Sequence, residues 1–193
     1  MNKKVRDILT GKVKEKISTY TNLAYPILII WQAWDAHWAI LTYLTITSIA
    51  MGVGSALFHG TLVHKFQKMD EAVMYSFISS LIIWNIGSIW LIPVGLIISA
   101  TMGLNHKHIP TSIGVGVLVF LNALSIGVFH GFWIWALWMI AGFLVALLIR
   151  QIGERFRGIF KITREREDFL IYDIFHGVWH IITAFVSKLS MII

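Results

Sequence analysis

The chain has 193 residues, of which 57% are hydrophobic and 13% are charged, with a net charge of +6 and no cysteine. So many apolar and so few charged residues exclude an ordinary soluble domain and indicate an integral membrane protein. The lack of cysteine excludes disulfides and thiolate metal sites, so a metal would need His, Asp or Glu ligands. Because the basic residues lie beside apolar segments, they favour a role at the membrane surface, and no nucleic-acid partner is expected.

Seven apolar segments follow one another along the chain. Residues 1–16 form a basic N-terminal segment, and residues 17–193 form a single membrane domain. The segments cover residues 17–34, 38–63, 70–84, 89–104, 109–129, 132–149 and 169–188. A helix needs ~20 residues to cross ~30 Å of hydrocarbon, so each segment is interpreted as one span, with soft boundaries, especially around residues 85–88. The predicted fold class is all-α, a seven-transmembrane helix bundle.

The positions of Lys and Arg predict the orientation of the bundle, because these residues accumulate in cytoplasmic loops. With seven spans, fifteen of the sixteen Lys and Arg residues fall on one side of the membrane and only Lys188 on the other. We therefore expect a cytoplasmic N-terminus and an outside C-terminus. The basic loop 150–168 should be cytoplasmic, partly helical and anchored to anionic lipid. The expected location is a plasma or inner membrane in a prokaryote, or the ER or Golgi in a eukaryote.

Two pairs of polar residues, each four apart, lie in apolar segments. They are Ser55 with His59, and His176 with His180. Four residues is just over one helical turn, so each pair shares one face of its helix. The expected topology places His59 ~9 Å and His176 ~15 Å from the cytoplasmic edge, where Asp70 opens the third span. A single membrane histidine usually serves helix packing, but these five residues at matched depth predict one site.

This set of residues is typical of a particular chemistry. Three neutral imidazoles with a vacant fourth position are the usual donors of a catalytic zinc site. Asp70 can then accept a proton from water, and Ser55 can donate to the oxyanion of a tetrahedral intermediate. The alternatives are that Asp70 is a helix N-cap and that Ser55 belongs to a small-residue packing surface. The pattern predicts amide or ester hydrolysis at membrane depth.

Other polar and aromatic residues have simpler explanations. Five further histidines fall at helix ends, where an interfacial side chain needs no special role: His37, His64, His106, His108 and His130. Five tryptophans fit interfacial belts: Trp84, Trp90, Trp133, Trp135 and Trp138. Asp173, three residues before His176, is either a hydrogen-bond partner of a metal ligand or a solvated pocket residue.

Three segments resemble the motifs of the alkaline ceramidases. They are GSALFHGTL at residues 54–62, Asp70-Glu71 eleven residues after His59, and FHGVWHIIT at residues 175–183. That family belongs to a superfamily of seven-helix hydrolases with adiponectin-type receptors and GPI-remodelling lipases. The similarity extends over residues 22–75 and the last span. It implies that His59, His176 and His180 bind zinc, that Asp70 activates the water, and that Ser55 supports the site.

The chain also departs from this family in two places. Animal alkaline ceramidases carry an acidic, tryptophan-containing calcium-binding segment before the first helix, where this chain has the basic sequence MNKKVR. Only Glu15 and Asn22 remain as possible calcium ligands, and calcium is therefore not expected. The end of the sixth span, at Arg150, lacks the Trp and Asp that the resemblance implies there.

The sequence thus predicts a zinc-dependent amidohydrolase that cleaves the N-acyl bond of ceramide or a related N-acyl lipid to a fatty acid and a long-chain amine. The lipid should enter from the bilayer, and water from the cytoplasmic mouth near residues 65–70. Two alternatives stay open: a lipid esterase or phospholipase of the same superfamily, and a lipid-binding receptor with a structural zinc site. The sequence does not decide between amide and ester, the acyl-chain preference or the oligomeric state.

Overall fold

The structure, a computed structural model, describes residues 15–30, 38–61, 64–104, 111–159 and 169–191. Within these ranges the chain is helical apart from short turns, which confirms the all-α class. The elements in chain order are α2 (Lys16–Thr21), α3 (Ala24–Ile30), α4 (Trp38–Thr61), α5 (His64–Ile86), the 3₁₀ helix η1 (Ile89–Leu91), α6 (Ile92–Leu104), α7 (Thr111–His130), α8 (Trp133–Ile159) and α9 (Phe169–Leu189).

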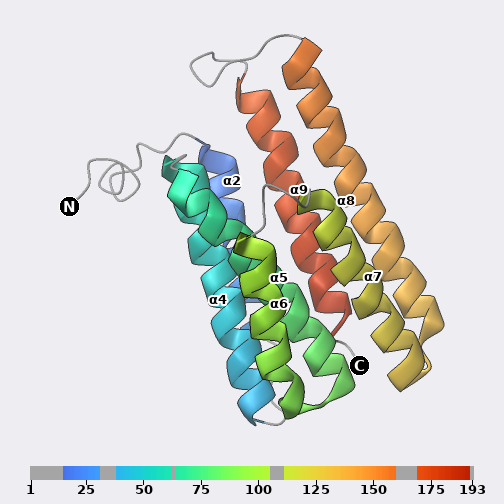
Figure 1. Cartoon of the computed structure of the whole chain (residues 1–193). Coiled ribbons are helices and arrows are strands. Elements are labelled where there is room, and N and C mark those ends of the chain that lie inside the picture. The colour runs from blue at the N-terminus through green and yellow to red at the C-terminus, as the bar shows by residue number, and fades with distance from the viewer. Residues whose placement is uncertain (1–14, 31–37, 62–63, 105–110, 160–168, 192–193) are drawn as a thin grey trace.

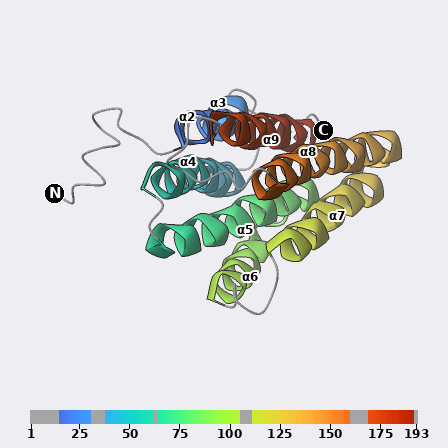
Figure 2. The ribbon, with the colours of Figure 1, turned by 90° about the horizontal axis from the view of Figure 1, so that it is seen from above.

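Six of the helices form a closed ring. Helices α3, α4, α5, α7, α8 and α9 each pack against the next, and α9 packs back against α3. Helix α6 lies outside this ring on α5, and α2 bridges α4 and α9. The view from above shows α9 beside α2 and α3, and α6 on the far side of α5 (Figure 2). The ring encloses the main hydrophobic core, which includes Leu44, Tyr75, Phe77, Met139 and Ala184.

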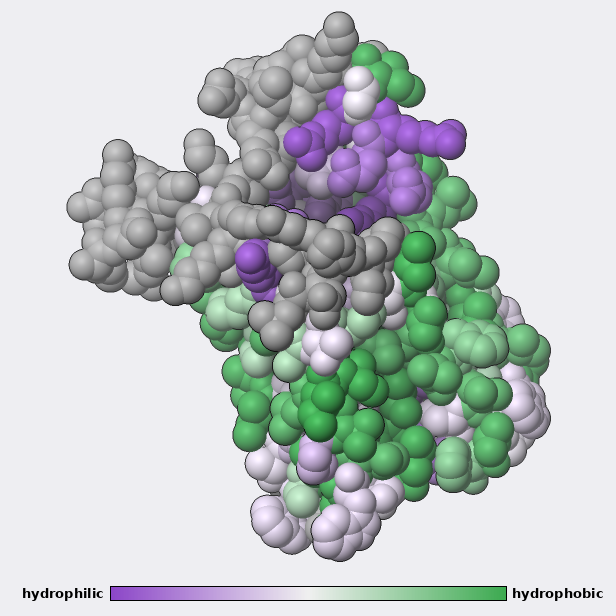
Figure 3. All heavy atoms as spheres, viewed as in Figure 1, coloured by the Kyte–Doolittle hydropathy of each residue, from purple (hydrophilic) through white to green (hydrophobic). Residues whose placement is uncertain are grey.

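Among the described residues, four helices are long and apolar enough to cross a membrane, namely α4, α8, the Ile113–His130 part of α7 and the Leu170–Leu189 part of α9. Large apolar side chains are exposed along their outer faces, as expected of helices that face lipid. Figure 3 shows a mostly apolar surface over the middle of the bundle and hydrophilic side chains near the end where α8 stops and α9 begins. These features agree with a membrane protein.

The first predicted span is not one helix, which corrects the expectation for residues 17–34. It is broken between α2 and α3, where Asn22 Nδ2 donates to Ser18 O (2.6 Å) and Tyr25 N donates to Asn22 O (3.4 Å). Pro26 explains the break, because proline has no N–H for the carbonyl four residues earlier and its ring clashes with that carbonyl. Hydropathy alone did not predict this interruption of the helix.

Helix α5 begins earlier than predicted, at His64 rather than Asp70. Asp70 therefore lies in its second turn, and the alternative that Asp70 caps the helix is wrong. Four of the six preceding residues, Lys65, Gln67, Lys68 and Met69, are good helix formers, so the helix extends beyond its apolar part. At the other end, the expected turn around residues 85–88 is present, where Gly87 (φ 72°) donates to Ile83 O (2.9 Å) and stops the helix. Helix α8 continues to Ile159, so the start of the basic loop is helical as predicted.

The structure shows the exposure and contacts of several residues that were predicted to lie at the membrane interfaces. Trp90, Trp133 and Trp138 are each more than half exposed, whereas Trp84 packs against the core. His130 ends α7 as expected, and its Nε2 donates to the carbonyl of Asn85 (2.8 Å). Several sequence-based predictions lie outside the described residues: those for residues 1–14, 31–34, 62–63, 109–110 and 160–168, and those for His37, His106 and His108.

Candidate metal centre

Three histidine side chains converge where α2, α4 and α9 meet. Helix α4 carries His59, and α9 carries His176 and His180 on one face because they are four residues apart. The ring centroid of His59 lies 4.6 Å from the ring centroid of His176 and 5.2 Å from that of His180. The centroids of His176 and His180 lie 4.9 Å apart. One nitrogen from each ring lies within 4.8 Å of the others, so the three can hold one metal ion.

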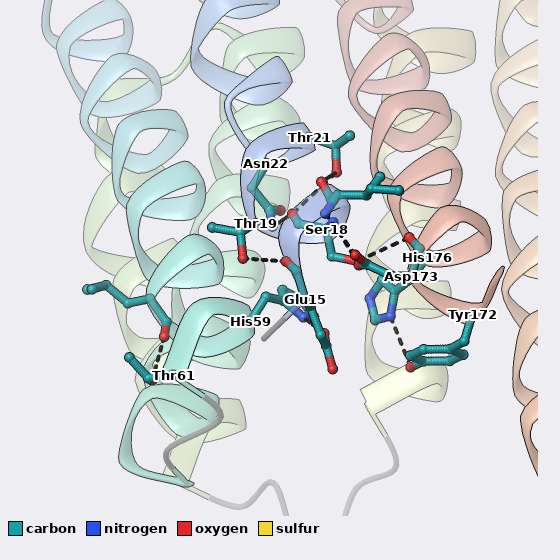
Figure 4. Close-up of polar contacts among 12 residues, drawn as sticks. Glu15, Ser18, Thr19, Thr21, Asn22, His59, Thr61, Tyr172, Asp173 and His176 are labelled. Carbon is teal, nitrogen blue, oxygen red and sulfur yellow. Dashed lines mark hydrogen bonds and ion pairs between the residues drawn. The ribbon is translucent and has the colours of Figure 1, made fainter. Parts of the chain in front are cut away.

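A carboxylate orients the first imidazole. Glu15, which immediately precedes α2, is hydrogen-bonded through Oε2 to Nδ1 of His59, and both side chains are buried (Figure 4). A carboxylate accepts a hydrogen bond from Nδ1–H, which fixes the tautomer in which Nε2 has a free lone pair. Metal-binding histidines commonly have such a carboxylate behind them. The contact therefore prepares Nε2 of His59 for a cation.

A longer chain of hydrogen bonds orients His176. Nδ1 of His176 lies 3.0 Å from the hydroxyl of Tyr172, and that hydroxyl donates to Glu154 Oε1 on α8 (3.0 Å). Since the hydroxyl proton goes to the carboxylate, Nδ1–H of His176 donates to the tyrosine oxygen. Nε2 of His176 is then left with its lone pair. Figure 4 shows this tyrosine below the ring of His176.

The third imidazole, that of His180, is the most deeply buried of the three. His180 is 1% exposed, and among the described residues neither of its ring nitrogens makes a hydrogen bond. A buried polar group without a partner is costly, and intramembrane histidines pair with other groups for this reason. A cation bound by all three rings would satisfy His180. The donor set therefore fits zinc, which prefers imidazole ligands and four-coordinate geometry.

Ser55 and Asp70 lie beside the histidines without joining the cluster. Ser55 is fully buried on α4, one turn before His59. The carboxyl group of Asp70 on α5 is close enough to interact with both Ser55 and His59. Yet Ser55 Oγ and Asp70 Oδ1 are both buried and have no hydrogen bond of ordinary geometry among the described residues. Two polar atoms are thus available to a water or a substrate next to the metal ligands.

Asp173 holds α2 in place, a role that neither sequence-based alternative included. It is buried on α9, and its carboxylate accepts from Ile17 N (2.8 Å), Ser18 N (2.9 Å) and Ser18 Oγ (2.5 Å). The two backbone N–H groups are otherwise unsatisfied donors at the start of α2. Gly177 permits the close approach, because a Cβ there would lie 2.5 Å from Ile17 Cγ2. Figure 4 shows Asp173 between α2 and His176.

An apolar cavity of about 40 Å³ lies in the middle of the helix ring. Each of the six ring helices contributes to its wall, for example through Tyr25, Met51, Phe77, Val119, Phe143 and Thr183. Two residues in the cavity wall, Tyr25 and Trp179, pack against the metal ligand His180. The ring of Tyr25 lies 6.3 Å from that of His180, and the ring of Trp179 lies 4.7 Å from it. The candidate metal centre thus lies beside an apolar space.

Sequence reasoning did not assign the residues behind the imidazoles. Tyr172 is four residues before His176, so its shared helix face was a usable signal. Glu154 and Glu15 gave no local signal, since 18 residues separate Glu154 from Tyr172 and 44 separate Glu15 from His59. Comparison of the sequence with protein-family models and with curated proteins finds no match. The ceramidase resemblance therefore stays a prediction that rests on the motif residues.

Proposed function

We propose that this chain is a zinc-dependent intramembrane amidohydrolase, which cleaves the N-acyl bond of ceramide or a related N-acyl lipid. The products would be a fatty acid and a long-chain amine. The observation that carries the proposal is the convergence of three buried histidines beside an apolar cavity that the whole helix ring lines. A metal centre next to an apolar space suits a substrate whose reactive group is polar and whose remainder is hydrocarbon.

Zinc is the metal that we propose for the three imidazoles. The described cluster contains three histidines, which leaves the position for a fourth ligand open, as in catalytic rather than structural zinc sites. When bound, zinc supplies Lewis-acid polarisation of a carbonyl group and lowers the pKa of water. Glu15 and Tyr172 then hold the tautomers of His59 and His176 throughout the reaction.

Asp70 and Ser55 perform the proton transfer and the charge stabilisation in this reaction. Asp70 accepts a proton from the attacking water as the new carbon–oxygen bond forms. The hydroxyl of Ser55 donates to the oxygen of the carbonyl group as negative charge develops on it. The carbon–nitrogen bond then breaks, and Asp70 returns the proton to the leaving amine. Both side chains fit these roles because Ser55 Oγ and Asp70 Oδ1 are buried beside the histidines and, among the described residues, make no hydrogen bond of ordinary geometry.

The chain would perform this reaction as a seven-span protein with a cytoplasmic N-terminus. The start of α2, the start of α5 and the end of α8 lie at one end of the bundle (Figure 1). The described basic residues Lys16, Lys68 and Arg155 belong to these ends, whereas Lys188 lies near the opposite end, in the last turn of α9. This distribution supports a cytoplasmic site, because Lys and Arg favour the cytoplasmic side.

The apolar cavity is proposed as the start of the acyl-chain site. At about 40 Å³ it has room for about three water molecules, so a longer chain would require side chains to move. Met51 and Met74 in its wall are suited to this, since methionine is unbranched and adapts its conformation.

The deciding experiment is product release from matched lipids by the purified, zinc-loaded protein. Ceramide and an O-acyl lipid with the same acyl chain would be compared, with His176→Ala as the inactive control. Fatty acid released from ceramide by wild type but not by the variant supports the proposal. Release from the O-acyl lipid alone would make the chain an esterase or phospholipase. Zinc content without hydrolysis of either would favour the receptor with a structural zinc site.

A further inference from the structure

A cationic side chain lies close to the candidate metal centre. The guanidinium carbon of Arg150, on α8, is 5.1 Å from the centroid of the Trp179 ring. That ring lies 4.7 Å from the ring of His180 and 5.5 Å from that of His176. A single aromatic ring therefore separates the cation from two of the metal ligands. The charge of Arg150 also interacts with Asp70, His176 and His180.

Arg150 differs from its neighbour Arg157, two turns further along α8. Arg157 makes the same kind of contact, 5.1 Å from the centroid of the Tyr172 ring, and its charge is paired with Glu154 at 3.8 Å. Among the described residues the ion pairs are Arg157 with Glu154 and Glu15 with His59, so no acidic side chain forms an ion pair with Arg150. Arg150 is partly buried, so among the described residues a shielded cation without an acidic partner lies beside the histidines, and such a cation indicates a functional site.

Trp179 links this cation to the apolar cavity, because the same tryptophan lines the cavity wall. The site thus offers hydrocarbon surface on one side and a guanidinium group on the other, with the histidines next to both. Cation–π contact orients the guanidinium while its N–H groups remain able to donate. Arginine binds planar carboxylates and phosphates through two parallel hydrogen bonds.

We propose that Arg150 binds an anionic group of the substrate, so that this site prefers N-acyl lipids with a carboxylate or phosphate close to the scissile amide. The inference rests on the proposed function and narrows its substrate class. Neutral ceramide would be hydrolysed more slowly than an anionic N-acyl lipid, because it leaves the guanidinium unpaired. Arg150 touches the substrate in this proposal and determines specificity without taking part in bond breaking.

The first experiment compares three probes that share one acyl chain. They are N-dodecanoylglycine, N-dodecanoylethanolamine phosphate and neutral N-dodecanoylethanolamine, which distinguish carboxylate from phosphate recognition. Wild type should hydrolyse at least one anionic probe with a kcat/KM about 10-fold or more above the neutral probe, as expected for hydrogen bonds to a charged group. Arg150→Gln should lose that preference, because its kcat/KM should fall more on the anionic probes than on the neutral probe.

The matched control is Arg155→Gln, which removes an equal charge from an exposed position on the same helix. It should keep the wild-type preference. Arg150→Met preserves an unbranched stem over Trp179 and serves as a second neutral variant if Arg150→Gln does not fold. Zinc content and thermal midpoint without probe report folding of each variant. A structural role for Arg150 would lower turnover of all three probes equally, and this result would overturn the inference.

A binding measurement separates failure of this inference from failure of the proposed function. The thermal midpoint of zinc-loaded protein in neutral detergent is recorded with each probe. An anionic probe should raise the midpoint more than the neutral probe in wild type and in Arg155→Gln, but not in Arg150→Gln or Arg150→Met. If wild type hydrolyses nothing yet shows this pattern, the proposed hydrolysis is wrong and anion binding at Arg150 stands. Equal shifts with charged and neutral probes refute anion binding even if hydrolysis is observed.

Discussion

Glu15 and His59 are joined by a buried hydrogen bond between Oε2 and Nδ1, although 44 residues separate them in the sequence. Glu15 lies just before α2, and α2 packs against both α4 and α9. The contact thus ties the orientation of one candidate metal ligand to a short helix at the start of the described chain.

Glu15→Ala should weaken zinc binding without abolishing it. The carboxylate orients His59 and increases the basicity of the ring, and loss of such a partner typically lowers metal affinity about 10–100-fold. Competition with a chromogenic zinc chelator measures the change. Lys16→Gln, at the next and exposed position, is the control and should match wild type. Equal affinities for Glu15→Ala and wild type would show that the carboxylate does not act on the metal.

His176→Ala and His180→Ala should each lose the bound metal. Wild type is expected to carry about one zinc per chain, and removal of one of three protein ligands leaves the ion under-coordinated. Elemental analysis of purified protein after dialysis against a weak chelator measures it. His130→Gln is the matched control, because His130 lies at the end of α7 and donates to Asn85 instead. Full zinc content in both alanine variants would show that His176 and His180 do not bind the metal.

Asp70→Asn should retain zinc and lose most of its turnover. An amide fills the same space but cannot accept the proton of water, and loss of a general base typically costs about 10²–10⁴-fold in rate. The measurement is kcat on the best substrate together with zinc content. Turnover close to wild type, with zinc retained, would assign Asp70 a packing role.

Asp173→Ala should destabilise the protein and loosen zinc. Its carboxylate accepts three hydrogen bonds from Ile17 and Ser18, and loss of such buried bonds costs about 2 kcal/mol or more. Because α2 follows Glu15 directly, the thermal midpoint and the zinc affinity should fall together. Ser187→Ala, which removes one hydrogen bond near the other end of α9, should lower the midpoint less and leave zinc affinity unchanged. A fall in thermal midpoint with unaltered zinc affinity would show that the position of α2 does not affect zinc binding.

Calcium should not be required for activity. Glu15, one of two residues that match calcium-ligand positions in the resemblance, is hydrogen-bonded to His59, and a hard dication needs several oxygen ligands. Activity and thermal midpoint are compared with a chelator selective for calcium over zinc and with added millimolar calcium. A large loss on chelation that calcium restores would reverse this expectation.

The order of helices and the identity of the three histidines followed from the sequence. Hydropathy is a local property, so runs of apolar residues indicated the helices without knowledge of their neighbours. The four-residue spacing of Ser55 with His59 and of His176 with His180 fixed their shared faces for the same reason. Hydropathy did not predict the helix boundaries where proline or helix propensity also determined the structure. Pro26 interrupts the first span, and the polar start of α5 is helical.

Tertiary structure decided what surrounds the histidines. The carboxylates of Glu15 and Asp173 act across helices on His59 and on the start of α2, respectively, and no spacing in the sequence encodes contacts between separate helices. The pairing of Arg157 with Glu154, and the absence of an ion pair at Arg150 among the described residues, likewise depend on how side chains pack at the end of α8. The apolar cavity exists only because six helices close into a ring. Local patterns determine helices and faces, whereas partners and cavities depend on how these helices pack together.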